Sequence, residues 1–172
     1  MLPTILAIVF VLCAITLWFL ITQHNLVDLD EKAKNAMCQI GLQLSSHYGA
    51  LLAILDVAKI YDAEESEPLI EDVISKRSIV AAKSSPKDVL FQEQVISDVL
   101  DRLALISEKH PQLKTNRKYI KAMDAVLTYK NMILTSKLIY NDFAAKLNRR
   151  IRLFPVSMVS RLLKLTEREF LN

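Results

Sequence analysis

The sequence contains very little glycine, cysteine or histidine, and each shortage excludes a class of protein. Its 172 residues include two glycines, two cysteines and three histidines. Two cysteines, one of them inside an apolar run, cannot form the disulfide framework of a small secreted domain. Asn-Gly and Asp-Gly hairpin turns are absent, and few prolines interrupt a chain rich in leucine, isoleucine, alanine, lysine and serine. This composition is typical of an all-α protein.

The residues that usually carry catalysis or bind metals are not arranged for either. His24, His47 and His110 are far apart, with neither the His-Glu-x-x-His spacing of zinc enzymes nor the Glu-x-x-His pairs of di-iron bundles. The carboxylates from Asp62 to Glu67 lack the spacing of an EF-hand. We therefore predict no catalytic residue, no metal and no cofactor, and expect the protein not to be an enzyme. His47 is interpreted as a histidine of the core.

The N-terminal run from Leu2 to Thr22 contains no charged residue. A helix needs about twenty apolar residues to cross a bilayer, and Trp18 near the end of the run suits the headgroup region. A cleaved signal peptide is the alternative, but no basic side chain precedes the run and no Ala-x-Ala site follows it. We therefore expect residues 2–22 to be an uncleaved membrane anchor. Lys32 and Lys34 follow it, which predicts an N-terminus outside and a cytoplasmic C-terminal domain.

The rest of the chain has the spacing of amphipathic helices. Apolar positions three or four residues apart predict helices over about 27–62, 68–83, 86–109 and 116–153. The stripe of the first helix consists of Ala33, Met37, Ile40, Leu44, His47, Leu51, Ile54 and Ala58. We predict an all-α fold in which an N-terminal transmembrane helix is followed by an antiparallel bundle of about four helices. The predicted divisions are an anchor at 1–24, a bundle at 25–155 and a basic amphipathic segment at 156–172.

The chain contains several distinctive short motifs: His24-Asn25-Leu26-Val27, Gln39-Ile40 with Gln43-Leu44 and Tyr48, Leu103 to Glu108 with Pro111, and most specifically Tyr140-Asn141, Asn148, Ile151 and Phe154-Pro155. Together these motifs resemble the LemA family of small membrane-anchored helical bundles from bacteria, and the resemblance covers nearly the whole chain. The resemblance implies an N-terminus outside, a helical domain inside and no settled biochemical activity. The chain departs from the family in its first helix, where small residues replace the usual charged residues and Ile-Pro kink.

Those small residues form a ridge, because Gly41, Ser45, Gly49 and Ala53 follow each other at intervals of four. Each glycine costs a helix about 1 kcal/mol relative to alanine, which indicates that the ridge has a packing role. Small residues at this spacing let a second backbone approach closely. Two interpretations follow. One is tight packing inside the protein's own bundle, and the other is self-association or the binding of a partner.

Tyr140, Asn141 and Asn148 are the polar positions of interest on the last long helix. Asn141 and Asn148 are one heptad apart and therefore share a face, beside the stripe that contains Tyr140. Amides that face a bundle seam fix the register of the helices at some cost in stability. We predict that these three residues set the bundle register, with binding of a partner peptide as the alternative.

The C-terminal end of the chain is basic and amphipathic. The residues predicted to contact a membrane surface are Arg149, Arg150, Arg152, Arg161, Lys164 and Arg168. On an anionic inner leaflet each basic residue contributes about 1 kcal/mol. The alternative is that the segment folds back on the bundle with its charges in solvent. Nucleic acid is not an expected partner, because the basic residues lack interleaved aromatic side chains.

These features favour a protein that acts by interaction at a membrane. We expect a non-enzymatic single-pass scaffold or adaptor whose partners are other membrane or envelope proteins, with a homo-oligomer as a further option. The alternatives are a membrane-shaping or self-assembling protein on the inner leaflet, and a bundle that binds a small ligand.

Overall fold

A computed structural model describes residues 2–171 of the chain. The first residue of the predicted anchor and the last residue of the predicted C-terminal segment lie outside this range. The described chain consists of five α-helices and one short 3-10 helix, without a strand: α1 (Leu2–Ala58), α2 (Ala63–Lys76), α3 (Pro86–Lys109), η1 (Pro111–Thr115), α4 (Arg117–Arg152) and α5 (Val156–Leu162). The predicted all-α bundle is confirmed.

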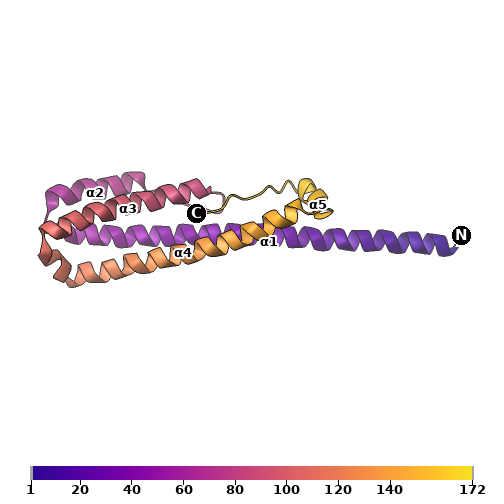
Figure 1. Cartoon of the computed structure of the whole chain (residues 1–172), viewed down its shortest axis with the longest axis horizontal. Helices are drawn as coiled ribbons and strands as arrows, with labels where there is room; N and C mark the ends of the chain where they lie inside the picture. Colours follow the sequence, from indigo (N-terminus) through magenta and orange to yellow (C-terminus); the bar gives the residue numbers. More distant parts are fainter. Residues whose placement is uncertain (1, 172) are drawn as a thin grey trace.

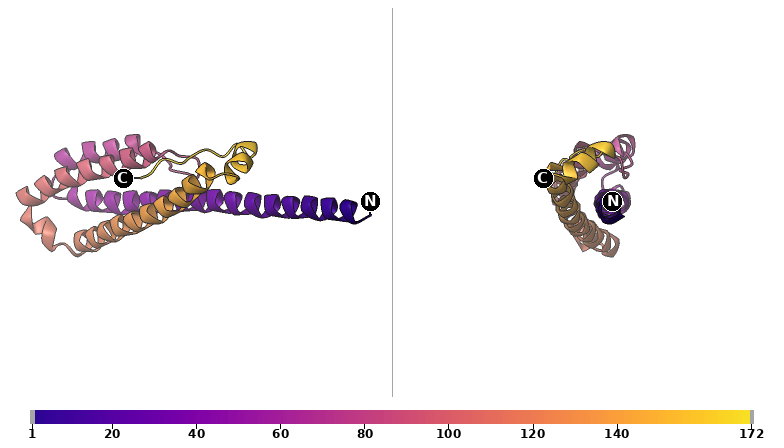
Figure 2. Two further views of the ribbon diagram at one scale, coloured as in Figure 1. Left: turned by 45° about the vertical axis from the view of Figure 1, so that its right-hand side comes forward. Right: turned by 90° about the vertical axis from the view of Figure 1, so that its right-hand side faces the viewer.

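Helix α1 is a single element of 57 residues and forms the long axis of the molecule (Figure 1). No proline occurs in α1 after Pro3, so the apolar N-terminal part continues into the bundle without a break. The N-terminal part extends beyond the bundle as a bare rod, while the rest is covered by the other helices (Figures 1 and 2). Helix α4 runs antiparallel to α1 and forms the main interface of the bundle with it.

The core lies where α1, α3 and α4 meet. All eight positions of the stripe predicted for the first long helix are buried, which confirms the helical spacing from the sequence. Tyr48 of α1 and Tyr140 of α4 are the largest fully buried side chains. The Tyr48 hydroxyl donates a hydrogen bond of 3.2 Å to the backbone oxygen of Gln92, which ties α1 to α3. Burial of the apolar stripes therefore holds the helices together, and hydrogen bonds such as this one orient the helices relative to each other.

Helix α2 differs from its prediction, since it spans 63–76 and not 68–83. Its start is earlier because the Asp62 carboxylate accepts a hydrogen bond of 3.1 Å from the Glu65 backbone N–H and caps the helix. Its end is earlier because the buried side chain of Gln92 binds the chain that leaves it. The Gln92 amide accepts a bond of 2.9 Å from the Ser78 N–H and donates one of 3.2 Å to the Lys76 carbonyl. Residues 77–85 therefore form a loop, the α2–α3 loop.

Helices α3 and α4 begin where the sequence predicts. Ser85 and Asp88 form a capping box, in which each side chain accepts a hydrogen bond from the other residue's backbone N–H, at 3.3 and 2.7 Å. Asn116 caps α4 by accepting a bond of 2.9 Å from the Lys118 N–H. Both starts depend on local side-chain chemistry, which explains why the sequence locates them well.

Candidate functional site

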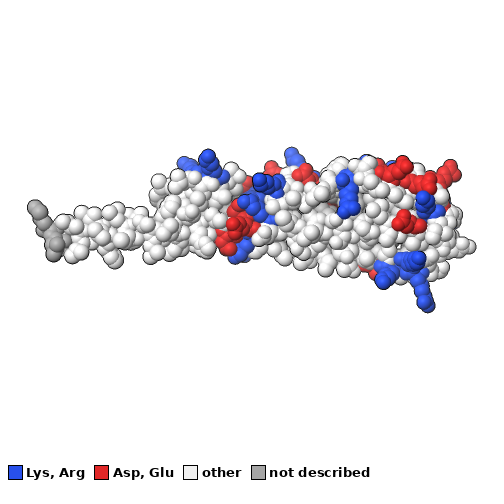
Figure 3. Space-filling view, turned by 180° about the vertical axis from the view of Figure 1, so that it is seen from behind, with Lys and Arg blue, Asp and Glu red and all other residues white. Residues whose placement is uncertain are grey.

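The rod, defined as residues 3–18 of α1, extends beyond the other helices of the described chain. Every one of its side chains is exposed, and the most apolar window of the helix has a mean hydropathy of 2.8. The rod shows no charged side chain in the space-filling view (Figure 3). Helix α1 is therefore long and apolar enough to cross a membrane near its N-terminus. Packing begins at Phe19 and is complete at Leu26, which is fully buried.

A small apolar cluster joins the rod to the rest of the molecule. Leu26 of α1, Leu147 of α4 and Val159 of α5 form its buried centre, and Phe19 and Ile151 pack against them. The last turns of α4 and the short helix α5 therefore lie beside α1 at the level where the rod enters the bundle (Figure 2). We call this region the junction.

After α5 the chain reverses and returns along the bundle as an extended strap, residues 165–171 (Figure 1). The reversal is a Schellman motif: the Leu165 N–H donates to the Ser160 carbonyl at 3.0 Å, and the Lys164 N–H donates to the Arg161 carbonyl at 3.1 Å. Lys164 stands at the left-handed position, with φ of 55°, where glycine is the usual residue. The motif directs the strap back toward α4.

Two asparagines of α4 hold the backbone of the strap. The Asn148 amide donates to the Arg168 carbonyl and accepts from the Arg168 N–H, both at 2.8 Å. Asn141 binds Leu171 in the same way, at 2.6 and 2.8 Å. The Tyr140 hydroxyl donates to the Glu169 carbonyl at 3.0 Å. The three residues predicted to set the bundle register are thus brought together on one extended segment.

The partner of these amides is the strap and not the helix–helix seam that their seven-residue spacing predicts. A primary amide offers one donor group and one acceptor side by side, which match the carbonyl and N–H of one extended residue. In a neighbouring helix, the backbone N–H and carbonyl groups already form the hydrogen bonds of that helix. The amides therefore bind the strap, and the register role assigned to Tyr140, Asn141 and Asn148 stays a prediction.

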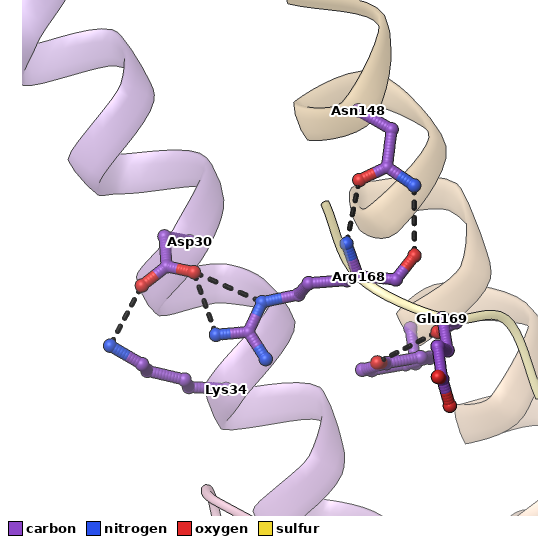
Figure 4. A network of polar contacts seen from close by, with 6 residues as sticks. Asp30, Lys34, Asn148, Arg168 and Glu169 are labelled. Carbon is purple, nitrogen blue, oxygen red and sulfur yellow. Dashed lines mark hydrogen bonds and ion pairs between the residues drawn. The ribbon is translucent and has the colours of Figure 1, made fainter. Parts of the chain in front are cut away.

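Asp30 of α1 adds a charged contact to the strap (Figure 4). The Arg168 guanidinium donates to Asp30 Oδ1 from Nη2 at 2.6 Å and from Nε at 3.0 Å, and Lys34 Nζ lies 2.7 Å from Asp30 Oδ2. Burial by itself raises the pKa of Asp30, but the bonds and positive charges of Lys34 and Arg168 outweigh it. The pKa of Asp30 therefore lies below its ordinary value. One ion pair thus joins the start of the bundle to the end of the chain.

The basic residues predicted to contact a membrane surface divide into two groups. Arg168 is bound to Asp30, and Arg152 donates to the Glu167 carboxylate at 2.8 Å, so both already have a partner in the strap or bundle. The remaining members are exposed and form no ion pair within residues 2–171: Arg149, Arg150, Arg161 and Lys164. Residues 156–162 are helical, and residues 165–171 fold back on the bundle, so contact of the exposed basic residues with a membrane surface stays a prediction.

The ridge of small residues on α1 is covered at one end only. Gly41 is buried under the α2–α3 loop, where a Cβ atom would lie 1.9 Å from the Val80 carbonyl oxygen. Ser45 accepts a hydrogen bond of 2.7 Å from Arg77 Nη2 of the same loop. Gly49 and Ala53 are exposed, and a Cβ at Gly49 would meet nothing within 4 Å. Close packing at Gly41 is therefore intramolecular, and self-association through the rest of the ridge stays a prediction.

His47 lies in the core at the edge of a pocket of about 380 Å³ between α1, α3 and α4. It is 4 % exposed, and neither ring nitrogen has a hydrogen-bond partner in the described chain. Burial, with a smaller contribution from the nearby charge of Lys130, lowers the pKa of His47 to about 4. The other side of the pocket carries Glu93, which binds Lys137 Nζ at 2.9 Å. His47 is therefore a histidine of the core, as its place on the apolar stripe predicts.

These features belong to a chain that a family model matches over residues 36–172, and that model describes the LemA family. The chain belongs to the LemA family. The matched range begins within α1, after the rod, and extends through the bundle and the strap. No curated protein matches the chain. The resemblance noted in the sequence is confirmed, and LemA is not a known enzyme family.

The sequence pattern does not identify Asp30, which holds the strap, or Gln92, which holds the α2–α3 loop. Asp30 has a local partner in Lys34, which suggests only a common i, i+4 surface pair. Its second partner, Arg168, is distant in the chain and gives no local signal. Gln92 looks like any polar helix residue, although it is fully buried and binds the α2–α3 loop. Only the folded arrangement identifies either one.

Proposed function

We propose that this LemA protein is a single-pass membrane protein that acts as a scaffold or adaptor, binding other membrane or envelope proteins through its helical bundle and not by catalysis. The observation that carries the proposal is the continuity of α1. A bare apolar rod and the central helix of the bundle are one unbroken element. A stiff link of this kind holds the bundle at a fixed distance and angle from a bilayer, which suits a protein that presents a surface.

We place the bundle in the cytoplasm and the N-terminus outside. Lys32 and Lys34 support this orientation, since basic residues flank the cytoplasmic side of membrane spans. The test uses Lys118, an exposed residue of α4, replaced by cysteine in a chain whose Cys13 and Cys38 are serine. A membrane-impermeant maleimide should label position 118 only after the cells are broken. Labelling of intact cells would reverse the orientation.

The scaffold role is tested by purifying the tagged full-length protein from its native membrane in a mild detergent. Mass spectrometry then identifies what is retained. A tagged chain that ends after the rod serves as the control, because it keeps the membrane segment and lacks the bundle. A stoichiometric partner that needs the bundle supports the proposal. Retention of the same proteins by the rod alone contradicts it, and self-oligomers without another partner favour the self-assembling alternative.

The ridge supplies a direct test of self-association. Gly41 is unsuitable as the only site of change, because a larger side chain there collides with Val80 inside the protein. Gly49 has open space around it and Ala53 is exposed, so Gly49→Leu leaves the fold intact. If copies pack through the ridge, Gly49→Leu lowers crosslinking between them, while Leu105→Ala on another helix does not. Equal crosslinking in both variants rules the ridge out as a contact between copies.

A small ligand in the bundle is the second candidate function, and the pocket beside His47 favours it. The pocket has apolar walls, including Leu90 and Ile133, and one buried imidazole without a hydrogen-bond partner in the described chain. Lys130 gives the pocket a positive side, and the charge of Glu93, which also lines it, is balanced by Lys137 at 2.9 Å. These groups suit a small organic anion with an apolar body. Native mass spectrometry of the purified protein tests this, with loss of the bound mass in His47→Leu as the expected result.

A further inference from the structure

We propose that the turn between α4 and α5 inserts its apolar side chains into the lipid bilayer beside α1, so that the bundle is held to the membrane at two points. The inference rests on the proposed function in one respect, namely that the rod of α1 crosses the bilayer. It adds a second lipid contact, far from the rod in sequence, and it assigns that contact to particular side chains.

The position of the turn along α1 is the first argument. At 1.5 Å per residue, residues 3–21 rise by about 28 Å, close to the thickness of the hydrocarbon core of a bilayer. Phe19, near the end of this stretch, packs against the cluster that contains Val159 of α5 and Ile151 of α4. Helix α5 therefore lies at the level where α1 leaves the hydrocarbon and enters the headgroup region. A side chain that points outward there meets lipid.

The exposed residues of this region are the second argument. Phe154 is 81 % exposed, Leu162 69 %, Met158 64 % and Leu153 52 %. Met158 and Leu162 are one turn apart on α5, while Val159 of the same helix is buried in the junction. Large apolar side chains grouped on one surface are a marker of an interaction site. The strap does not cover them, because it runs back along α4 toward Asn141.

The charges around the turn indicate which partner covers it. Arg149, Arg150 and Arg161 are exposed and have no carboxylate partner within residues 2–171. Arg149 and Arg150 line a groove of about 500 Å³ with Leu153 and with Asn25, Asp28 and Leu29 of α1. The one carboxylate in that set, Asp28, is paired with Lys32 at 2.7 Å. In Figure 3 the first charged side chains seen on the body next to the rod are basic. Apolar side chains beside unpaired arginines match anionic headgroups above acyl chains, so the occupant is the bilayer and not a second protein.

The experiment uses the full chain and its single tryptophan, Trp18, which lies in the rod. Full-length protein is placed in bilayers of phosphatidylcholine and phosphatidylglycerol whose acyl chains carry bromine, a short-range quencher of indole fluorescence. Trp18 in the native sequence reports on the rod. A Trp18→Phe, Phe154→Trp variant reports on the turn. Phe154 is mostly exposed, so the larger ring has room. Trp18→Phe, Leu105→Trp is the matched control, since Leu105 is exposed and lies in the last turns of α3, a helix that ends away from the rod (Figure 1).

The proposal requires that bromine quench the indole at position 154 several-fold more strongly than the indole at position 105. Met158→Trp in the same background should behave as position 154 does. If Trp18 is quenched and positions 154 and 158 resemble position 105, the rod is in the bilayer and the insertion of the turn is refuted. If Trp18 is not quenched, the membrane anchor of the proposed function fails, and this inference fails with it.

Discussion

Replacing Gly41 by alanine is expected to destabilise the protein, whereas the same replacement at Gly49 is expected to stabilise it. The two glycines are on the same helix, two turns apart, and differ only in what faces them. A Cβ at Gly41 would lie 1.9 Å from the Val80 carbonyl oxygen and 2.8 Å from its carbonyl carbon. A Cβ at Gly49 would meet nothing within 4 Å. The pair therefore separates close packing from helix propensity.

The magnitudes follow from two opposing effects. Alanine is favoured over glycine in a helix interior by about 1 kcal/mol, and this gain applies at both positions. At Gly41 the contact is with backbone, so the α2–α3 loop must move, and overpacking of this kind costs about 1–3 kcal/mol. Because 1.9 Å is far inside contact distance, we expect the upper part of that range. The net change is a loss of about 1–2 kcal/mol at Gly41 and a gain of about 0.5–1 kcal/mol at Gly49.

The assay is thermal unfolding of the full-length protein in mild detergent, followed by far-ultraviolet circular dichroism. For a domain of this size, 1 kcal/mol shifts Tm by about 2–4 °C. Gly41→Ala should therefore lower Tm by several degrees, and Gly49→Ala should raise it by a few. If both variants raise Tm equally, the α2–α3 loop does not pack on Gly41. The ridge would then have to be explained by contacts between molecules.

Three further predictions concern the strap and the core. Asp30→Asn should lower the free energy of unfolding at neutral pH by about 1.5–3 kcal/mol, measured by denaturant unfolding. Because the pKa of Asp30 is lowered in the folded protein, its stabilising contribution is present above the ordinary pKa of 3.8 and is lost as the pH falls through the folded-state pKa. The stabilities of wild type and variant should therefore converge in acid. Asn148→Ala removes both bonds to the Arg168 backbone and should speed hydrogen exchange of the strap, whereas Asn131→Ala, exposed on the same helix, should not. His47 has a pKa lowered to about 4, so the stability of the wild type should decline as the pH falls from about 6.5 to about 4. His47→Leu should abolish that decline in a series of Tm measurements across this range, and an unchanged slope would show that another group is responsible.

Local residue patterns suffice to predict helices α1, α3 and α4 and the family of the chain. Apolar spacing along α1 and α4 depends on residues three or four apart, and the caps at Ser85 and Asn116 depend on residues within one turn. The uncharged run at the N-terminus and the motif from Tyr140 to Pro155 are likewise contiguous signals. Each of these features depends on residues that are close together in the sequence, so each can be predicted without knowledge of the tertiary contacts. The end of helix α2 is predicted too late because it depends on Gln92 of another helix, whereas its start is predicted too late although the Asp62 cap is a local signal.

Only the folded chain shows which surfaces are covered and which remain free. Asn141 and Asn148 were recognisable as a pair on one helix face, but a helical pattern does not show that an extended strap will bind them. The apolar residues of the strap follow no helical spacing. Its ion pair between Arg168 and Asp30 joins residues that are 138 positions apart in the chain. Gly41 and Gly49 look alike in sequence, and only the path of the α2–α3 loop makes one buried and the other open. Contacts between distant segments depend on how the chain returns on itself, and no local spacing of residues records that path.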